Sequence, residues 1–312
     1  MDITESQVVE ICKKYNYDFI SFELLGIGAF NLNYLLKTKQ DKFVLRIENN
    51  DQFHFKKDEY EILRSLNGKF GPKVYFFDDS KKIIPADYLI EEFIDVGEHP
   101  PAVASDEFIE TMGKWYRRLH LIKIKKQDST YDLVKAFNFN YNKYSENKEV
   151  LEKNDQEIID KLLEKALKIL KSNNNIFSRR KYLSLTQGDP TRSNIFYSNK
   201  TVKLIDWEFA MYHYREYDLA FFVWSYLRRD EKRKLTFFKH AGYPTTDFSR
   251  KQFELMYLIR CLDMLAWSIE RLSLIKSGKI DLRQTNSIFE EVLYGIREDF
   301  QVIENALANP FL

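Results

Sequence analysis

The sequence predicts an α+β protein of two lobes, a small antiparallel sheet followed by a larger helical lobe that one β-hairpin interrupts. In roughly the first hundred residues, short runs rich in β-branched and aromatic side chains alternate with turns containing glycine or proline. Beyond that region, apolar residues mostly recur three and four positions apart, as in helices. We place the boundary after residue 95, which gives domains of residues 1–95 and 96–312.

The first lobe is expected to begin with a capped helix over residues 4–15, with Thr4 or Ser6 as its N-cap. Two strands follow, Asn33–Thr38 and Lys42–Ile47, which the polar residues KQD separate. Gly26 and Gly28 lie just before the first of these strands and predict a glycine-bearing turn. The chain therefore opens with a helix and a small antiparallel sheet.

A second helix is expected in the stretch KKDEYEILRSLNGKFGP, where Ile62, Leu63 and Leu66 have helical spacing and a Gly and Pro cluster ends the helix. The segments KVYFFD and DYLIEEFI then complete a sheet of about five strands. In the second lobe we expect helices over residues 105–124, 155–173, 216–240, 249–277 and 284–306. Residues 125–154, rich in Lys, Asn and Tyr, are interpreted as a partly helical insertion.

Charge and composition narrow the classes of partner. The 48 Lys and Arg residues nearly balance the 47 Asp and Glu residues, so no net field draws the chain to nucleic acid or to an anionic membrane. This balance favours a small-molecule partner. Cys12 and Cys261 lie far apart and offer neither a disulfide framework nor a metal-ligand spacing. With no apolar run after a basic start, and charges inside the most apolar late segment, we expect a soluble, cytoplasmic protein.

Three polar side chains border the predicted hairpin, in the stretch LTQGDPTRSNIFYSNKTVKLIDWEF. Asp189, Asn194 and Asp206 have residue types that strands disfavour and that are costly to bury unpaired. An acid, then an amide, then a second acid is the order that phosphoryl transfer from ATP needs. Asp189 would accept the proton of an attacking hydroxyl, while Asn194 and Asp206 would hold Mg²⁺. The hairpin returns the chain, so it would bring Asp206 back to Asn194.

The segments QGDPTRSNIF and LIDWE resemble the signature of the aminoglycoside phosphotransferase and choline/ethanolamine kinase family. The resemblance extends to MGKWYRRLH and REYDLAFFVW and covers about residues 25–300. It implies a protein-kinase-like fold, with a nucleotide-binding first lobe and a catalytic, substrate-binding second lobe. It also implies an ATP- and Mg²⁺-dependent kinase that phosphorylates a hydroxyl of a small molecule.

The same resemblance assigns nucleotide-binding roles in the first lobe. Gly26 and Gly28 would form a short turn over the phosphates, and Arg46 stands where protein kinases place lysine. A guanidinium stays charged and can bind phosphate oxygens with two hydrogen bonds.

Two further features of the first lobe complete the expected nucleotide site. Glu59 is the expected partner of Arg46, because Leu63 and Leu66 follow it at helical spacing, and Glu61 is the alternative. In LIEEFIDVG, which resembles the hinge, backbone groups near Glu92 and Ile94 would meet adenine.

The sequence departs from the family pattern at Gln187, where the family usually has His. That His is generally a structural hydrogen-bonding residue, and Gln offers both a donor and an acceptor. Asp218 would cap or brace the loop. Arg192 would contact the transferred phosphate or a substrate carboxylate, or point to solvent. Gln187 and Arg46 also motivate an alternative function, a pseudokinase or nucleotide-binding module without turnover.

The acceptor is expected to carry an amine. Asp263, Trp267 and Glu270 recur at positions that share one helix face, and Glu208 and Trp224 are expected nearby. Carboxylates and indoles together suit an amine or quaternary ammonium, through charge pairing and cation–π attraction. The alternative is an amphipathic helix whose Trp is core and whose acids face water.

Overall fold

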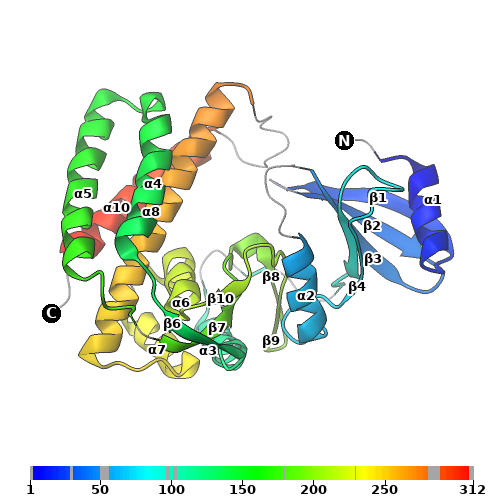
Figure 1. The fold of residues 1–312 in the computed structure, drawn as a ribbon, viewed down its shortest axis with the longest axis horizontal. Coiled ribbons are helices and arrows are strands. Elements are labelled where there is room, and N and C mark those ends of the chain that lie inside the picture. The colour runs from blue at the N-terminus through cyan, green and yellow to red at the C-terminus, as the bar shows by residue number, and fades with distance from the viewer. Residues whose placement is uncertain are drawn as a thin grey trace. The chain divides into compact units, whose positions relative to one another are not determined.

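The computed structural model describes residues 3–28, 31–49, 56–95, 99–100, 104–178, 180–228, 230–279 and 289–308. Figure 1 shows its helices and strands. The chain forms two compact units, Met1–Pro100 with Ser193–Ala210, and Pro101–Arg192 with Met211–Leu312. The predicted boundary after residue 95 falls close to the first change of unit. However, residues 193–210, which the prediction placed in the second lobe, make their contacts with the first unit.

The first unit contains the predicted sheet of five strands, in the order β1-β2-β3-β5-β4, with neighbouring strands antiparallel. Its elements in chain order are α1 (Glu5–Lys14), β1 (Phe19–Ile27), β2 (Asn31–Thr38), β3 (Lys42–Glu48), α2 (Lys56–Leu66), β4 (Val74–Asp78) and β5 (Tyr88–Glu92). The expectation that Gly26 belongs to a turn is wrong. Gly26 lies inside β1 opposite Asn33, because a register shift after Leu24 lets the strand continue.

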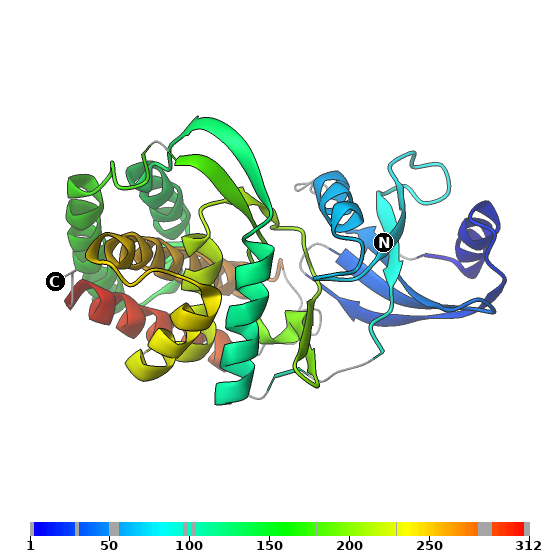
Figure 2. The ribbon, with the colours of Figure 1, turned by 90° about the horizontal axis from the view of Figure 1, so that it is seen from below.

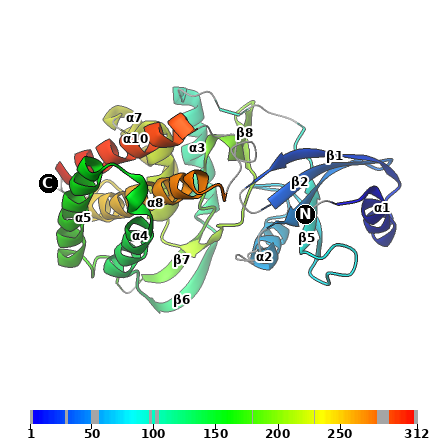
Figure 3. The ribbon, with the colours of Figure 1, turned by 90° about the horizontal axis from the view of Figure 1, so that it is seen from above.

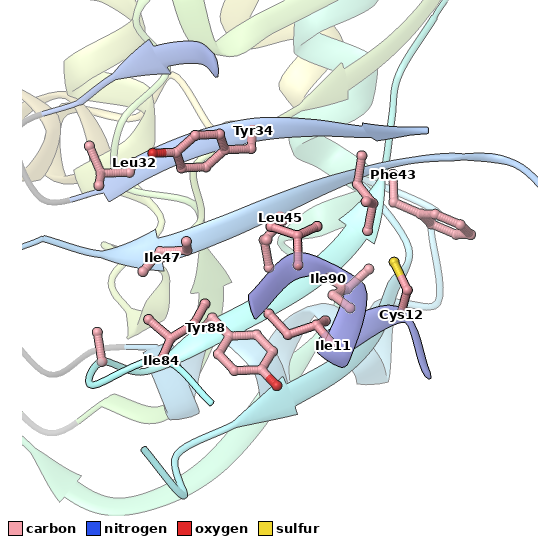
Figure 4. Packing of buried hydrophobic residues seen from close by; sticks show 13 residues of the cluster. Ile11, Cys12, Leu32, Tyr34, Phe43, Leu45, Ile47, Ile84, Tyr88 and Ile90 are labelled. Carbon is pink, nitrogen blue, oxygen red and sulfur yellow. The ribbon is translucent and has the colours of Figure 1, made fainter. Parts of the chain in front are cut away.

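The core of the first unit lies between α1 and the sheet (Figure 4). Thr4 caps α1, as predicted, and the helix buries Val8, Ile11 and Cys12. These side chains pack with strand residues such as Leu45, which is fully buried. Burial raises the pKa of the Cys12 thiol to about 11. Helix α1 is therefore part of the lobe's core.

The predicted hairpin consists of β8 (Ile195–Ser198) and β9 (Thr201–Leu204), which pair antiparallel. Asn199 and Lys200 form its turn with φ of 47° and 62°, the backbone that two-residue hairpins favour. The hairpin packs on the segment after α2, where the Leu204 N–H donates to the carbonyl of Phe70 over 3.0 Å. A Cβ at Gly71 would lie 2.4 Å from Trp207 Nε1, so only glycine fits there. This packing explains why the hairpin belongs to the first unit.

The second unit is mainly helical, with a three-stranded sheet in the order β10-β7-β6 (Figure 2). Its helices are α3 (Asp106–Leu119), α4 (Leu133–Asn147), α5 (Lys153–Ser172), α6 (Glu216–Phe222), α7 (Glu231–Ala241), α8 (Asp247–Lys276) and α10 (Phe289–Ala308), with a π-helical turn over Val223–Leu227. Its strands are β6 (Lys123–Ser129), β7 (Arg180–Thr186) and β10 (Met211–His213).

Two of the helices predicted for this unit differ from the structure. The helix expected over residues 105–124 ends at Leu119, because the chain turns into β6 and pairs with β7. The helix expected over residues 216–240 is broken after the π-helical turn, where Arg228 has a positive φ of 23°. The part of the last predicted helix before residue 289 lies outside the described residues.

Helices α4, α5, α8 and α10 pack together in the second unit (Figure 3). Helix α8 begins at its N-cap Thr246 and buries Cys261 in its middle. Both cysteines are free and buried. Among the helices described, none combines the length and the apolar character that crossing a membrane requires.

A buried carboxyl group lies where α10 packs on α8. Asp299 of α10 is 1% exposed and accepts a hydrogen bond of 3.3 Å from Ser268 Oγ. Burial raises the pKa of Asp299 to about 7, although Arg228, Ser268 and the Trp224 side chain lower it and Glu298 raises it. Asp299 is therefore a neutral acid in the folded protein below about neutral pH.

We predict that Asp299 makes the stability of the fold fall as pH rises. An unfolded Asp ionises near pH 3.9, so between that pH and about 7 the folded state binds the extra proton. The loss between pH 5 and pH 8 should be about 2 to 3 kcal/mol. The Cys261 thiol, which Asp299 also affects, stays neutral in this range because burial raises its pKa.

Denaturant unfolding of the wild type and of Asp299→Asn at pH 5 and pH 8 checks this prediction. The free energy of unfolding of the variant should fall less between the two pH values, because Asn does not ionise. Glu304→Gln, an exposed acid on the same helix, should keep the wild-type slope. An unchanged slope in Asp299→Asn would contradict the assignment.

Candidate functional site

Arg46 of β3 is at the centre of a buried ionic cluster in the first unit. Its side chain is 5% exposed, and Nη1 lies 2.5 Å from Glu59 Oε1 on α2. Nη2 lies 2.8 Å from Asp206 Oδ1, and Glu91 Oε2 is 3.8 Å from Nη1. The pairing of Arg46 with Glu59 is confirmed, whereas Glu61, the alternative partner, is exposed.

The charges around Arg46 are unequal. Burial alone would lower the pKa of the Arg46 guanidinium. Nearby carboxylates instead raise this pKa well above its usual value, and they belong to Glu59, Glu91, Asp206 and Glu208. Four carboxylates thus act on this one guanidinium.

The hairpin brings Asn194 and Asp206 together, as its spacing predicts. The Ile205 N–H donates to the carbonyl of Asn194 over 2.9 Å, so Asp206 directly follows the residue bonded to Asn194. Asp206 has a positive φ of 60°, a conformation that Asp tolerates better than most residues and that often occurs at functional sites. The next residue, Trp207, is fully buried, and its N–H donates to Glu59 Oε1 over 3.1 Å. Thus Glu59 holds both Arg46 and the chain after Asp206.

The donor set at this end of the hairpin fits Mg²⁺. Mg²⁺ binds through one or two carboxylates together with phosphate and water oxygens, and does not need a cage made only of protein. Asn194, which is 7% exposed, and Asp206 offer an amide and a carboxylate oxygen. Among the residues described, no group of three or more His, Cys, Asp or Glu side chains could hold a metal ion. These two residues could hold a metal ion only together with oxygen ligands from outside the protein, such as phosphate or water.

The turn between β1 and β2 contains Gly28, whose N–H donates to the carbonyl of Asn31 over 2.8 Å. Asn31, the first residue of β2, donates from Nδ2 to Glu208 Oε2 over 2.8 Å. Ala29 and Phe30 lie outside the described residues. Glu208, predicted to bind the acceptor, therefore contacts β2 beside this turn.

The predicted hinge residues lie at the end of β5. The Glu92 N–H donates to the carbonyl of Lys73 over 2.8 Å, and Glu92 Oε1 lies 2.6 Å from Lys203 Nζ. Ile94 is 8% exposed and follows the strand. The Glu92 N–H is therefore already bonded to another backbone group. The expected contact with adenine stays a prediction, and it would involve backbone groups that follow Glu92.

In the second unit, the loop that carries Asp189 is held by Asp218 at the start of α6. The fully buried Asp218 carboxylate accepts hydrogen bonds from the Gln187 N–H at 3.1 Å and from the Gly188 N–H at 2.8 Å. His120 Nε2 lies 3.0 Å from Asp218 Oδ2. The predicted loop-bracing role of Asp218 is confirmed.

Gln187 acts as a hydrogen-bonding residue within the same loop. Its side chain is fully buried, and its Oε1 accepts the N–H of Asp189 over 2.9 Å. Gly188 between them has φ of 89°, which favours glycine. Gln187 therefore fixes the backbone of Asp189, while the Asp189 side chain is half-buried.

A buried arginine near Asp189 was missed as a site residue. Arg260 of α8 donates from Nη1 to Tyr217 Oη over 2.6 Å and to Asp263 Oδ2 over 2.8 Å. Its guanidinium lies over the rings of Tyr217 and Phe221, at 4.4 and 4.2 Å from their centres. Burial opposes its charge, but Tyr217, Asp263 and Asp189 raise its pKa. The sequence contained one indication of this residue, because Arg260 is a charged residue within the apolar segment MYLIRCLDMLAWSIERL.

The predicted acceptor-binding acids of α8 have protein partners. Asp263 accepts hydrogen bonds from Arg260 and from Asn140 Nδ2, and Glu270 Oε2 lies 2.7 Å from Lys143 Nζ on α4. Both acids thus pair with protein groups, and their binding of an amine stays a prediction.

The two predicted indoles differ in exposure. Trp267 is 46% exposed, with the Arg271 guanidinium 5.5 Å from its ring centre. Trp224 is half-buried and has the Arg228 guanidinium 4.9 Å from its ring centre. The interpretation of Trp267 as a core residue is excluded, because its side chain is exposed.

The sequence profile of choline/ethanolamine kinases matches residues 21–294. The chain belongs to the choline/ethanolamine kinase family. No curated protein matches it in sequence.

Several solved kinase structures are similar to this chain over nearly their whole length. Choline kinase LicA from Streptococcus pneumoniae is 15% identical with a TM-score of 0.68, covering 96% of this chain and 99% of that one. Spectinomycin phosphotransferase, solved with ADP and spectinomycin, is 14% identical with a TM-score of 0.67, covering 98% and 99%. Choline kinase from Cryptosporidium parvum Iowa II is 17% identical with a TM-score of 0.62, covering 97% and 98%. These likenesses confirm the predicted α+β, protein-kinase-like fold.

Membership of the choline/ethanolamine kinase family implies small-molecule kinase activity. Within the first unit, the structure brings together Arg46, Glu59, Asn194 and Asp206. Within the second, it places Asp189 on a braced loop.

Proposed function

We propose that the protein transfers the γ-phosphate of ATP to a hydroxyl group of a small molecule. The observation that carries this proposal is that Arg46 is bonded both to Glu59 on α2 and to Asp206 after the hairpin. A strand cation, a helix acid and a metal-binding acid are the parts that position a nucleotide in kinases. The family profile supports the same conclusion independently.

Each residue has a defined task in this proposal. The acceptor oxygen attacks the γ-phosphorus, the bond to the β,γ-bridging oxygen breaks, ADP leaves, and Asp189 takes the hydroxyl proton. Arg46 contacts the phosphates near the glycine-bearing turn, while Asn194 and Asp206 hold Mg²⁺. The metal ion neutralises charge on the phosphates when bound.

For the acceptor we propose a molecule that carries an amine besides its hydroxyl. Similar structures include choline kinases and a phosphotransferase solved with spectinomycin, and the exposed ring of Trp267, over which the Arg271 guanidinium lies, suits a cation. Since Asp263 and Glu270 are paired with Arg260 and Lys143, the amine would share these carboxylates or rely on aromatic contact.

The test is ADP release with Mg·ATP and a panel of hydroxylated amines, each paired with a neutral and an anionic analogue. We expect turnover with at least one amine, dependence on Mg²⁺, and little turnover with its analogues. Turnover confined to neutral or anionic acceptors would contradict the amine proposal. Nucleotide binding without turnover on any acceptor would favour the alternative, a nucleotide-binding module, which the substitutions at Gln187 and Arg46 motivated.

A prediction for the metal site is that Asp206→Asn weakens Mg²⁺-dependent nucleotide binding by about 10- to 100-fold. A lost interaction with a charged group costs about 1.5 to 3 kcal/mol, which corresponds to that range. Calorimetric titration with AMP-PNP, with Mg²⁺ and with EDTA, measures the effect. Asp79→Asn, an exposed acid in the same unit, is the matched control and should bind as the wild type does. Equal Mg²⁺ dependence in Asp206→Asn and wild type would refute Asp206 as a ligand.

A further inference from the structure

Arg260 of α8 is a buried cation whose hydrogen bonds to the described residues all come from one nitrogen atom. Its two bonds, to Tyr217 Oη and to Asp263 Oδ2, both come from Nη1. Nε is buried without a hydrogen-bond partner, and Nη2 makes no hydrogen bond within the part of the chain that the structure describes. The residue is 6% exposed. Because a buried donor without a partner is costly, this edge of the guanidinium calls for an occupant.

The unused nitrogen atoms form a two-pronged donor. In a guanidinium, Nε–H and one N–H of Nη2 point the same way, so together they can bond both oxygens of one carboxylate. Contacts with the rings of Tyr217 and Phe221, whose centres lie 4.4 and 4.2 Å from Arg260 Cζ, help to hold the group in place. Asp263 bonds only to Nη1, so the ion pair leaves the other edge unused.

Arg260 is connected to the loop of Asp189 through α6. Its partner Tyr217 precedes Asp218, whose carboxylate accepts the N–H of Gly188, the residue before Asp189. Burial lowers the pKa of the Arg260 guanidinium, while nearby groups, Asp189 among them, raise it. The unused edge therefore belongs to the surroundings of the proposed base.

We propose that Arg260 determines acceptor specificity by binding a carboxylate of the acceptor through Nε and Nη2. This inference rests on the proposed function, and it narrows the acceptor to a hydroxylated amino acid, which carries a hydroxyl, an amine and a carboxylate. Asp263 and Asp189, whose carboxylates act on Arg260, would repel a simple anion but attract the amine of a zwitterion. The bonds to two N–H groups would then distinguish the amino acid from the amino alcohol that lacks its carboxylate.

Pairs of acceptors that differ only in the carboxylate test this assignment. L-serine is compared with ethanolamine, and L-homoserine with 3-aminopropan-1-ol. ADP release gives kcat/KM, and calorimetric titration into the protein with Mg·AMP-PNP gives the affinity without turnover. In the wild type, the amino acid of at least one pair should exceed its amino alcohol by about 10- to 100-fold in both, the equivalent of hydrogen bonds to a charged group.

Variants of Arg260 show whether this residue is the cause. Arg260→Lys keeps a positive charge beside Asp263 but removes the two parallel donors. It should lower kcat/KM and affinity by about 10- to 100-fold for the amino acid and by less than about threefold for the amino alcohol. Arg250→Lys, the same exchange at an exposed position of α8, should leave both acceptors unaffected. Thermal unfolding shows which variants are folded, and Arg260→Gln, the second variant, should show the same selective loss.

Three results would overturn the inference. Equal losses for both members of a pair would mean that Arg260 only supports the fold and that water occupies its unused edge. No preference for either amino acid in the wild type would exclude recognition of a carboxylate. Weaker binding of Mg·AMP-PNP or of inorganic phosphate in Arg260→Lys, with both pairs unaffected, would assign the edge to a phosphate. The proposed function fails separately, if no acceptor supports ADP release, because the titrations do not depend on turnover.

Discussion

Replacing Asp189 with Asn should lower the rate of phosphoryl transfer by about 100- to 10,000-fold, the usual contribution of a general base. Asn has nearly the same shape but cannot accept the proton. The hydrogen bond that Gln187 makes in this loop goes to the backbone N–H of residue 189, so the substitution leaves it in place. Rapid-quench measurement of a single turnover, with the best acceptor of the panel, determines the loss.

The nucleotide affinity of Asp189→Asn separates loss of chemistry from loss of structure. It should match that of the wild type, because the braces on the loop come from Asp218 and Gln187. Asp79→Asn, the exposed control, should keep both the turnover rate and the affinity. Normal turnover in Asp189→Asn would show that another group takes the proton.

Replacing Arg46 with Met should destabilise the fold by about 3 to 5 kcal/mol, the usual cost of breaking a buried ion pair. The substitution leaves Glu59, whose side chain is fully buried, without its positive partner. Urea unfolding of wild type and variant measures the difference, and nucleotide affinity should also fall because the phosphates lose their cation.

A second substitution shows whether the buried charge is the cause. Arg46→Met/Glu59→Leu should regain part of the lost stability, though not all, because the Trp207 N–H then loses its acceptor. Lys37→Met breaks the exposed pair with Glu23 and should cost at most about 1 kcal/mol. Similar costs for Arg46→Met and Lys37→Met would contradict the role of Arg46 in holding the buried cluster.

Features that depend on neighbouring positions were predictable from the chain alone. The hairpin between Asn194 and Asp206 follows from two short strands and an Asn–Lys turn, so its two ends meet whatever surrounds them. Glu59 as the partner of Arg46 followed from helical spacing and from the resemblance. The five-stranded sheet and helix α1 follow from periodicity and capping.

Other features needed contacts between distant parts of the chain. Strand β6 has the composition of a polar insertion, and pairing with β7 makes it a strand. Arg260 marked an interruption in the sequence, but only packing places its guanidinium over the rings of Tyr217 and Phe221. Only packing also brings it under the electrostatic influence of Asp189. The residues next to a position in the sequence do not indicate which distant residues it will contact in the fold.

Local patterns thus determined the secondary structure of most segments, the family and the chemistry expected at Asp189, Asn194 and Asp206. Tertiary structure decided which charges are already paired, namely Asp263 with Arg260, Glu270 with Lys143 and Glu208 with Asn31. The reason is physical, since backbone preference acts over a few residues, whereas a side-chain partner is selected by folding from anywhere in the chain. Asn31 and Glu208 are 177 positions apart, so no spacing rule could have joined them.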